Sequence, residues 1–391
     1  MNDNSKNLRI ARTFVQKKGD KKYFNTPTLK HIAKKAGVSF QTVSHALNST
    51  GRVSEKTRDM IRKIVSEMHY TPNAIARSFT LQRTNTVGLL FPFIFEPNFF
   101  AKIYRGIEDT LERHGYFAIL CCSDNDVKKE RRYLEILEQR RVDGLIMHPD
   151  AMDESNRDYV LRLKRKIPVV FIDRLMREVE TDYVVSDNRG GGYKLTKHLL
   201  GLGHKRIAII LGDDYMVTSV QDRLEGYRRA LAEADIIWDE RMILKSDNMV
   251  GAKSLETVQA RGADITRRIL DISERPTAIF VITDVLIKPV FEVIQEKGLR
   301  VPEDIAVVGF DDSGAASSAP IPVTTVAQQI YEMGQTAANI FLEKVKNPDT
   351  DEIKRIELET KLVIRESCGV QLVRMTRNAG YNRANLYRER R

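Results

Sequence analysis

The stretch that most limits what this chain can fold into runs from Val38 to Asn48 and reads VSFQTVSHALN. A helix advances about 100° per residue, so a helix here would turn three apolar side chains inward, those of Val43, Ala46 and Leu47. The opposite arc would carry Phe40, Gln41, Ser44 and His45. An aromatic ring, an amide, a hydroxyl and an imidazole are unusual on a face that only meets solvent. They suit a helix that reads base edges in the major groove of DNA.

The residues on either side predict two more helices. Thr28 is a suitable N-cap for a first helix, whose apolar residues follow the i, i+3, i+4, i+7 spacing, namely Leu29, Ile32, Ala33 and Ala36. Gly37 stands where that helix must end, and Ser39 can cap the second helix. Ser54 begins a third helix with one apolar side, made of Ile61, Ile64, Val65 and Met68. The pattern predicts a helix-turn-helix unit, although another small three-helix bundle would share it.

Five motifs in this region closely resemble the start of the LacI/GalR family of bacterial repressors. They are TLKHIAKKAGVS at 28–39, TVS at 42–44, RVS at 52–54, the pair Thr57-Arg58, and YTPNAIARS at 70–78. The resemblance implies a dimeric, operator-binding transcription factor that responds to a ligand.

Residue roles follow from this resemblance by position. Phe40, Gln41 and His45 are expected to read bases, and Gln41 can pair with an adenine edge. The expected phosphate contacts, which fix the register on the duplex, are Thr28, Ser39, Asn48, Thr57 and Asn73. Residues 72–85 are expected to form a hinge helix and linker, which enters the minor groove through Ala76 and Phe79.

Phe79 departs from the family, which usually has leucine at this position as a wedge in the central base step. Phenylalanine is also an acceptable wedge, so we expect Phe79 and its dimer mate to unstack that step partly. The alternative is that Phe79 packs between paired hinge helices. Unchanged DNA bending by a Phe79→Ala variant would decide for packing.

Charge is unevenly distributed along the 391 residues, whose formal net charge is +10. Residues 1–80 hold 16 Lys or Arg against 5 Asp or Glu, residues 81–368 hold 41 against 47, and residues 369–391 hold 6 against 1. The larger positive excess therefore lies on the helix-turn-helix end, as phosphate binding requires. We expect 1–27 to be a basic, disordered extension, with extra DNA contacts as the alternative. The basic tail at 369–391 is given no role.

Composition argues against several other classes of protein. No run of about 18 apolar residues could span a membrane, and the basic N-terminus lacks the apolar segment of a secretory signal. Cys121 and Cys122 are adjacent and Cys368 stands apart, which favours a reducing cytosol and argues against zinc or a disulfide framework. We therefore expect a cytoplasmic protein with no membrane contact, no metal and no cofactor.

From Thr86 onward, short Val, Ile and Leu runs alternate with amphipathic stretches, which is typical of parallel sheets covered on both faces. Strands are expected at 87–91, 117–120, 144–147, 169–172, 207–211, 278–282 and 305–309. Helices are expected at 99–114, 128–140, 155–166, 190–202, 219–234 and 285–297. This number of strands and helices is too large for a single sheet. We expect an all-α helix-turn-helix domain at 28–71, followed at 86–368 by an α/β core of two doubly wound parallel-sheet subdomains.

The family resemblance continues through this core. Its motifs are NFF at 98–100, RVDG at 141–144, IDR at 172–174, LGHKRI at 202–207, VPEDI at 301–305 and GFDD at 309–312. The resemblance implies a core like that of periplasmic binding proteins, which holds an effector and supplies the dimer interface. In that fold the chain crosses between subdomains three times, here near 185, 325 and 350.

Ligands of open α/β folds bind beyond the carboxyl ends of the strands, which places the expected site in the cleft between subdomains. Asp173, Arg223 and Asp311 stand at or beyond such ends, and the matching positions in the family contact the effector. Carboxylates and a guanidinium can bind vicinal hydroxyls in a bidentate manner, so we expect a sugar or sugar derivative. Strand-end aspartates also commonly cap helices. Phe99 and Phe100 can stack on a sugar ring or a base, and they can equally be packing residues in the first turn of a helix.

A second departure from the family leaves the effector open. The family usually has Asn-Asp and then Ala-x-Gly where this chain reads TDVLIKP from Thr283 to Pro289. Thr283 can still hydrogen-bond a hydroxyl, but it lacks the two-ended amide. Regulation by a nucleobase or a protein partner therefore stays as an alternative. Pro289 is compatible only with the start of the following helix.

Signs of catalysis are weak. The Gly190-Gly-Gly192 run is not Gly-x-Gly-x-x-Gly and favours a turn from Asp187-Asn188 into a helix. His198 and His204 do not form a zinc pair on one helix face. We expect no enzyme and no catalytic residue. A ligand-binding protein without DNA function is another class, against which the basic helix-turn-helix argues.

Oligomeric state follows from geometry. A two-fold operator needs two helix-turn-helix units, and the tail from Val370 lacks the leucine heptads of a tetramerising coil. We therefore expect a homodimer on a palindromic double-stranded operator.

Overall fold

The computed structural model describes residues 27–48, 50–70, 83–92, 99–150, 154–212, 215–246 and 254–372. The chain forms two compact units, Met1–Leu81 and Gln82–Arg391, which are called here the helical unit and the core unit. Nearly all of the expected extension at 1–27 lies outside the described residues, as do most of the hinge at 72–85 and of the tail at 369–391. The expectations for those segments stay predictions.

The helical unit holds α2 (Leu29–Ala36), α3 (Phe40–Asn48) and α4 (Glu55–Glu67). Each helix contacts the other two, and the buried apolar side chains lie at their common centre, namely Ile32, Ala33, Val43, Ala46, Ile61 and Ile64. Each helix is too short to be stable alone in water. Their packing therefore holds all of them in place.

Local signals fix the helix ends as expected. Gly37 has a φ of 66°, a left-handed conformation that glycine adopts without strain, and there α2 stops. The Ser39 hydroxyl accepts a hydrogen bond from the backbone N–H of Thr42 at 3.0 Å, and the Ser54 hydroxyl accepts one from that of Thr57 at 3.3 Å. These bonds satisfy first-turn donors that a helix leaves open. The turn between α2 and α3 is thereby determined.

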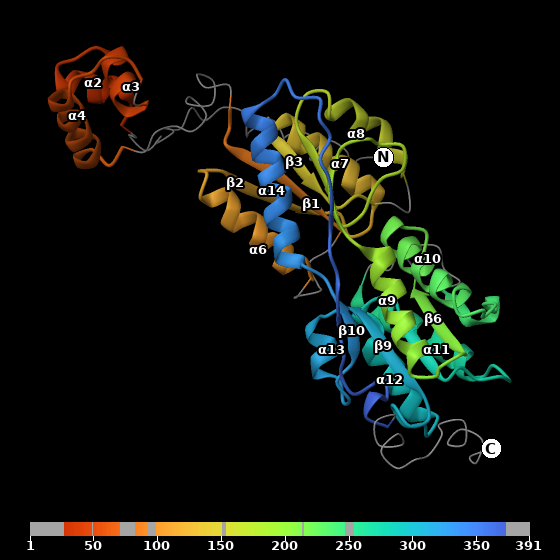
Figure 1. The fold of residues 1–391 in the computed structure, drawn as a ribbon. Helices are drawn as coiled ribbons and strands as arrows, with labels where there is room; N and C mark the ends of the chain where they lie inside the picture. The colour runs from red at the N-terminus through yellow and green to blue at the C-terminus, as the bar shows by residue number, and fades with distance from the viewer. Residues whose placement is uncertain are drawn as a thin grey trace, which may run out of the picture. The chain divides into compact units, whose positions relative to one another are not determined.

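The core unit is built on two six-stranded sheets (Figure 1). Sheet A has the order β11-β5-β4-β3-β1-β2. Its strands are β1 (Thr86–Phe91), β2 (Phe117–Cys122), β3 (Gly144–Met147), β4 (Val169–Ile172), β5 (Asp182–Ser186) and β11 (Arg355–Leu358). One face packs on α6 (Phe99–Glu112) and α14 (Ile330–Lys346). The other packs on α7 (Val127–Gln139) and α8 (Arg157–Leu163), which the single-turn η1 (Glu154–Asn156) precedes.

Sheet B has the order β12-β10-β9-β8-β6-β7. Its strands are β6 (Ile207–Gly212), β7 (Ile243–Lys245), β8 (Ala278–Val281), β9 (Ala306–Asp311), β10 (Thr324–Ala327) and β12 (Lys361–Val363). One face packs on α9 (Asn188–Gly201) and α10 (Thr218–Ala232). The other packs on α11 (Leu255–Leu270) and α12 (Ile287–Glu296). Three short helices complete this subdomain, η2 (Glu240–Met242), η3 (Asp284–Leu286) and α13 (Gly314–Ser318).

The expected architecture of two doubly wound subdomains is confirmed. Pairings among the described strands are parallel, apart from that of β12 with β10. All seven expected strands form. The prediction missed five others, β5, β7, β10, β11 and β12, and it also missed α11, α13 and α14. Pro289 lies in the first turn of α12, as its ring requires.

The chain passes between the sheets three times, and two of these passages lie where they were expected. The first follows Ser186 at the end of β5, and the second lies between Ala327 of β10 and Ile330 of α14. The third lies between Leu358 and Lys361, so the expected position near 350 was wrong. The reason is β11, an unpredicted strand that keeps the chain in sheet A for several more residues. None of the helices in the described part of the chain could cross a membrane.

Candidate functional sites

The outward face of α3 has the composition and exposure that the sequence predicted. Val43 and Ala46 are buried and Leu47 is half-buried. Gln41 and His45 are exposed, and Phe40 is 49% exposed although it is a large apolar residue. Exposing an aromatic ring beside an amide and an imidazole gains nothing for folding. The face is therefore available to bind a partner.

The imidazole of His45 is held by the loop that follows α3. Its Nδ1 lies 3.0 Å from the hydroxyl of Thr50. Its ring also lies over Gly51, where an added Cβ would come within 2.9 Å of Cγ and Nδ1. Gly51 has a φ of 68° as well, so only glycine fits without strain. The hydroxyl of Thr50 and the backbone at Gly51 therefore limit the orientations that the His45 ring can take.

The residues assigned to phosphates lie at helix starts and ends in the helical unit. Thr28 and Ser39 are exposed N-terminal residues of α2 and α3, and Asn48 ends α3. Thr57, in the first turn of α4, is half-buried, and its hydroxyl lies 2.8 Å from that of Ser54. Backbone N–H groups at helix N-termini favour anions. Asn73, Ala76 and Phe79 lie outside the described residues, so their assigned roles stay predictions.

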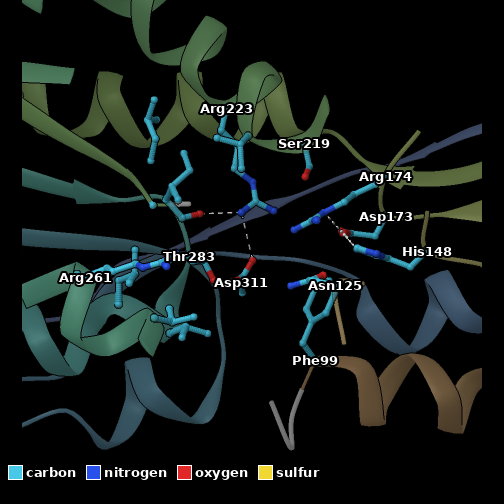
Figure 2. Close-up of a pocket in the computed structure, with 18 of the residues that line it drawn as sticks. Phe99, Asn125, His148, Asp173, Arg174, Ser219, Arg223, Arg261, Thr283 and Asp311 are labelled. Atoms are coloured by element: carbon cyan, nitrogen blue, oxygen red, sulfur yellow. Dashed lines mark hydrogen bonds and ion pairs between the residues drawn. The ribbon is translucent and has the colours of Figure 1, made fainter. Parts of the chain in front are cut away.

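A cavity of about 120 Å³ lies between the two subdomains of the core unit. It is lined by residues from both sheets' helices and strand ends (Figure 2). All five side chains predicted to bind an effector line it, namely Phe100, Asp173, Arg223, Thr283 and Asp311. The strand-end rule and the family resemblance together therefore selected residues that are far apart in the sequence and close in the fold.

Asp173 follows β4 directly and has a φ of 66°, so the backbone turns sharply at the strand end. Its Oδ2 lies 2.9 Å from Nε2 of His148, the residue that follows β3. Burial alone raises the pKa of Asp173, but the hydrogen bond from His148 and the charges of Arg174 and Arg223 bring it below the ordinary value. The ionised form of Asp173 is therefore favoured, and its Oδ2 also lies 3.9 Å from Nε of Arg174.

Arg223 extends from α10 into the cleft and is 5% exposed. Its Nε donates to Oδ1 of Asn188 at 2.8 Å, and Nη1 donates to the carbonyl of Ile282 at 2.7 Å. The guanidinium also lies 3.8 Å from the ring centroid of Phe310. Asp311 Oδ1 is 3.5 Å from Nη1. These contacts hold the guanidinium in one plane, as oriented recognition requires.

Glycine permits this placement of Arg223. A Cβ at Gly192 of α9 would come within 2.3 Å of the Arg223 carbonyl oxygen, and one at Gly226 of α10 within 2.1 Å of the Arg189 carbonyl oxygen. The two helices can approach so closely only because these positions lack a Cβ. The glycine run at 190–192 belongs to the start of α9, where Asp187 accepts from the N–H of Gly190 at 2.6 Å. The expected turn into a helix is confirmed.

Asp311 ends β9 and uses both carboxylate oxygens within the protein. Oδ2 accepts from the Thr283 hydroxyl at 2.7 Å, and Oδ1 accepts from Nε2 of Gln328 at 2.6 Å. Burial raises the pKa of Asp311, although Arg223 counteracts this. Burial also raises the pKa of the neighbouring Asp284 well above its ordinary value, and the charge of Asp311 adds to the effect. This pair of carboxyls therefore keeps a proton to higher pH than separate carboxyls would.

Several lining residues were missed by the sequence prediction. They are Asn125, His148, Arg174, Ser219 and Arg261, among others. Phe99, which the sequence offered beside Phe100 as a stacking residue, also lines the cavity. His148 could have been found, because it is a polar residue directly after a buried strand. Arg261 could not, because α11 was not predicted. Within the described residues no group of His, Cys, Asp or Glu side chains is placed to hold a metal ion.

Two family profiles match the chain. The profile described as bacterial regulatory proteins, lacI family, matches residues 28–73, which include α2, α3 and α4. The profile of the periplasmic binding protein-like domain matches residues 196–368. The first match therefore covers the three helices of the helical unit, and the second covers the part of the cleft that holds Arg223, Thr283 and Asp311.

Relatives agree over most of the chain. The HTH-type transcriptional repressor PurR of Aliivibrio fischeri (strain MJ11) is 35% identical over 340 residues, which cover 87% of this chain and 98% of PurR. A transcriptional regulator CelR–cellobiose complex is 31% identical, covers 87% of this chain and 99% of that chain, and has a TM-score of 0.65. The Lac repressor dimer bound to operator and the anti-inducer ONPF is 26% identical, covers 88% and 99%, and has a TM-score of 0.75. This chain belongs to the LacI family of bacterial regulatory proteins and is a DNA-binding transcriptional regulator, not an enzyme.

Proposed function

We propose that this protein is a repressor that binds a palindromic operator as a homodimer and is controlled by a small molecule, a sugar or sugar derivative, in the cleft of the core unit. The observation that carries the proposal is the exposed face of α3. Phe40, Gln41 and His45 project from a helix whose opposite side is fixed in a small core. A rigid helix with oriented polar side chains is the means by which a helix-turn-helix unit reads bases.

Exposed apolar surface on the core unit supports the dimer. Phe117 is 76% exposed and Ile119 is 38% exposed, and both lie on β2, which ends the order of sheet A. An exposed apolar edge strand favours association unless something covers it. Near α12 and α13 a second apolar surface forms a groove, to which Phe291, Leu299 and Ile321 contribute. A second copy of the chain can cover both surfaces, and the similar Lac repressor was crystallised as a dimer on operator.

The cleft supports control by a small molecule. Its polar groups come from both subdomains, so a bound ligand would contact both and change the angle between them. One contact already joins the subdomains here, the backbone N–H of Leu175 donating to the Thr218 hydroxyl at 3.1 Å. The related CelR structure holds cellobiose, which favours a sugar. A change in this angle would alter the spacing of the two segments at 72–80 and thus the fit to DNA.

Selection of bound duplexes from a random pool tests the proposal. The expected result is a palindrome with two half-sites, bound by a dimer that light scattering measures directly. A Phe117→Asp variant should shift the protein toward monomer and weaken binding to the palindrome, whereas Ile237→Asp, at a position that is also exposed, should do neither. Enrichment of a single half-site, or of no sequence, would count against the proposal.

A further inference from the structure

Two guanidinium groups face each other across the cleft. Arg174 follows β4 in the sheet A subdomain, and Arg223 lies on α10 of the sheet B subdomain. Figure 2 shows their side chains directed toward one another. Aspartates lie beside both cations: Nε of Arg174 is 3.9 Å from Oδ2 of Asp173, and Nη1 of Arg223 is 3.5 Å from Oδ1 of Asp311. Burial lowers the pKa of Arg223, the charges of Asp311 and Asp173 raise it, and the charge of Arg174 lowers it again.

A third cation lines the same cavity. Arg261 extends from α11 and lies on the side of the cavity near Thr283. The carboxylates that line the cavity are Asp173 and Asp311. Three arginines therefore stand against two aspartates, and one aspartate has a raised pKa. The lining therefore carries more cationic than anionic side chains.

The carboxylates in the lining already accept hydrogen bonds from other groups of the protein. Both oxygens of Asp311 accept hydrogen bonds from Thr283 and Gln328, and Oδ2 of Asp173 accepts from His148. Oxygens that already accept one hydrogen bond keep another lone pair, so a neutral sugar can use them, but it gains no attraction between opposite charges. Negative charge would instead gain from guanidinium groups that are held in a cavity of low dielectric constant.

We propose that the effector carries an anionic group, a phosphate or a carboxylate, which binds between Arg174 and Arg223 with Arg261 beside it and draws the two subdomains together. The inference rests on the proposed function of the cleft and specifies the class of its ligand. The anion adds one attraction on each side of the cleft, so it binds the closed arrangement more tightly than the open one. Such a difference in affinity is what drives a conformational change.

Matched pairs of sugars test this in the full-length protein. Binding is measured by calorimetry and by thermal unfolding for glucose against glucose 6-phosphate, glucose against glucuronate, and ribose against ribose 5-phosphate. At least one anionic member should bind and raise the Tm by several degrees at about 100 times its Kd, and its neutral partner should bind more weakly. A comparison of the two sugar phosphates with glucuronate shows whether the cleft binds a phosphate or a carboxylate.

Variants locate the anion. Arg174→Gln should weaken binding of the anionic sugar by about 10- to 100-fold and leave its neutral partner unaffected, and Arg174→Lys should restore part of the loss. Arg177→Gln, in the same loop but exposed and outside the lining, serves as the matched control and should change nothing. Unaltered Tm of the ligand-free variants excludes misfolding.

The outcomes separate this inference from the proposed function. If neutral sugars bind and their anionic partners do not, the cleft is an effector site but the inference is overturned. If no anionic sugar binds, the inference is equally overturned, and neutral sugars then decide the proposed function by themselves. Tight binding of an anionic sugar that is insensitive to Arg174→Gln also overturns it.

Discussion

The helical unit and the core unit place their functional side chains in opposite ways. On α3, Phe40, Gln41 and His45 are exposed on the surface of the helix. In the cleft, Asp173, Arg223 and Asp311 are buried and are each bonded to neighbouring side chains or backbone. This difference in exposure matches the difference in size between the two proposed ligands. A duplex is large and must meet a convex surface, whereas a small molecule can be enclosed.

This contrast has an energetic side. The exposed side chains that are proposed to read bases contribute little to folding, so replacing them should weaken DNA binding and leave the stability of the protein unchanged. Buried charged groups are part of the folded structure, so replacing them should affect stability first. Substitutions in the two units should therefore separate effects on ligand binding from effects on the stability of the fold.

Salt should have the largest effect, and only on the helical unit. If a dimer makes about 6–10 phosphate contacts, affinity for the operator falls by roughly 10³–10⁵ between about 50 and 200 mM salt. Binding in the cleft should change far less, because buried charges are weakly screened. Parallel titrations with operator and with the ligand found in the sugar panel measure both. Equal salt dependence of the two would remove the contrast.

Arg223→Ala should destabilise the core unit by about 3–5 kcal/mol, because it leaves Asp311 without its buried cation. The hydrogen bonds to Asn188 and Ile282 are lost as well. Denaturant unfolding of the core unit measures the change. The exposed Arg229 on the same helix α10 is the control, and Arg229→Ala should have a small effect. A fully stable Arg223→Ala protein would show that the buried network is dispensable.

Gln41→Ala should weaken binding to the selected operator by about 1–3 kcal/mol and binding to random duplex very little. The reason is that an amide can pair with a base edge, and its loss removes discrimination rather than charge. Gel-shift titrations on both duplexes measure the effect, and the unfolding transition should not move. Equal losses on the two duplexes would mean that Gln41 does not read bases.

Ser54→Ala should have the smallest effect, a loss of about 1 kcal/mol in the stability of the helical unit. The hydroxyl of Ser54 caps α4 through the N–H of Thr57, and the variant leaves that donor to water. Amide exchange in α4 measures this directly. Ser54→Asp, which keeps an acceptor at the cap, should retain the stability. Loss of stability in both variants would assign the effect to something other than the cap.

Sequence was most informative where structure is local. The α3 face and its caps could be predicted because periodicity and a capping hydroxyl act within a few residues. The cleft residues could be predicted because parallel strands end at one edge of a sheet. The family resemblance then assigned roles to the residues that these rules had placed.

The elements that the sequence did not predict are defined by contacts with residues far away along the chain. Strand β11 reads RIEL and is half exposed, so its charged residues conceal a strand that only pairing with β5 defines. Helix α14 packs a broad surface on α6 and sheet A, which includes small residues such as Gly334, Ala337 and Ala338. Its apolar stripe is therefore hard to recognise in the sequence. Arg261 was missed because its helix, α11, was not predicted either.

The central claim is that an oriented α3 reads a two-fold sequence and that the cleft governs this reading. The most direct test is the ratio of affinities for the selected palindrome and a scrambled duplex of equal length, measured with and without the sugar panel. We predict a ratio of at least about 10³ that one cleft ligand changes in wild type but not in a core-unit variant that no longer binds it. A ratio near one under all conditions would contradict the account.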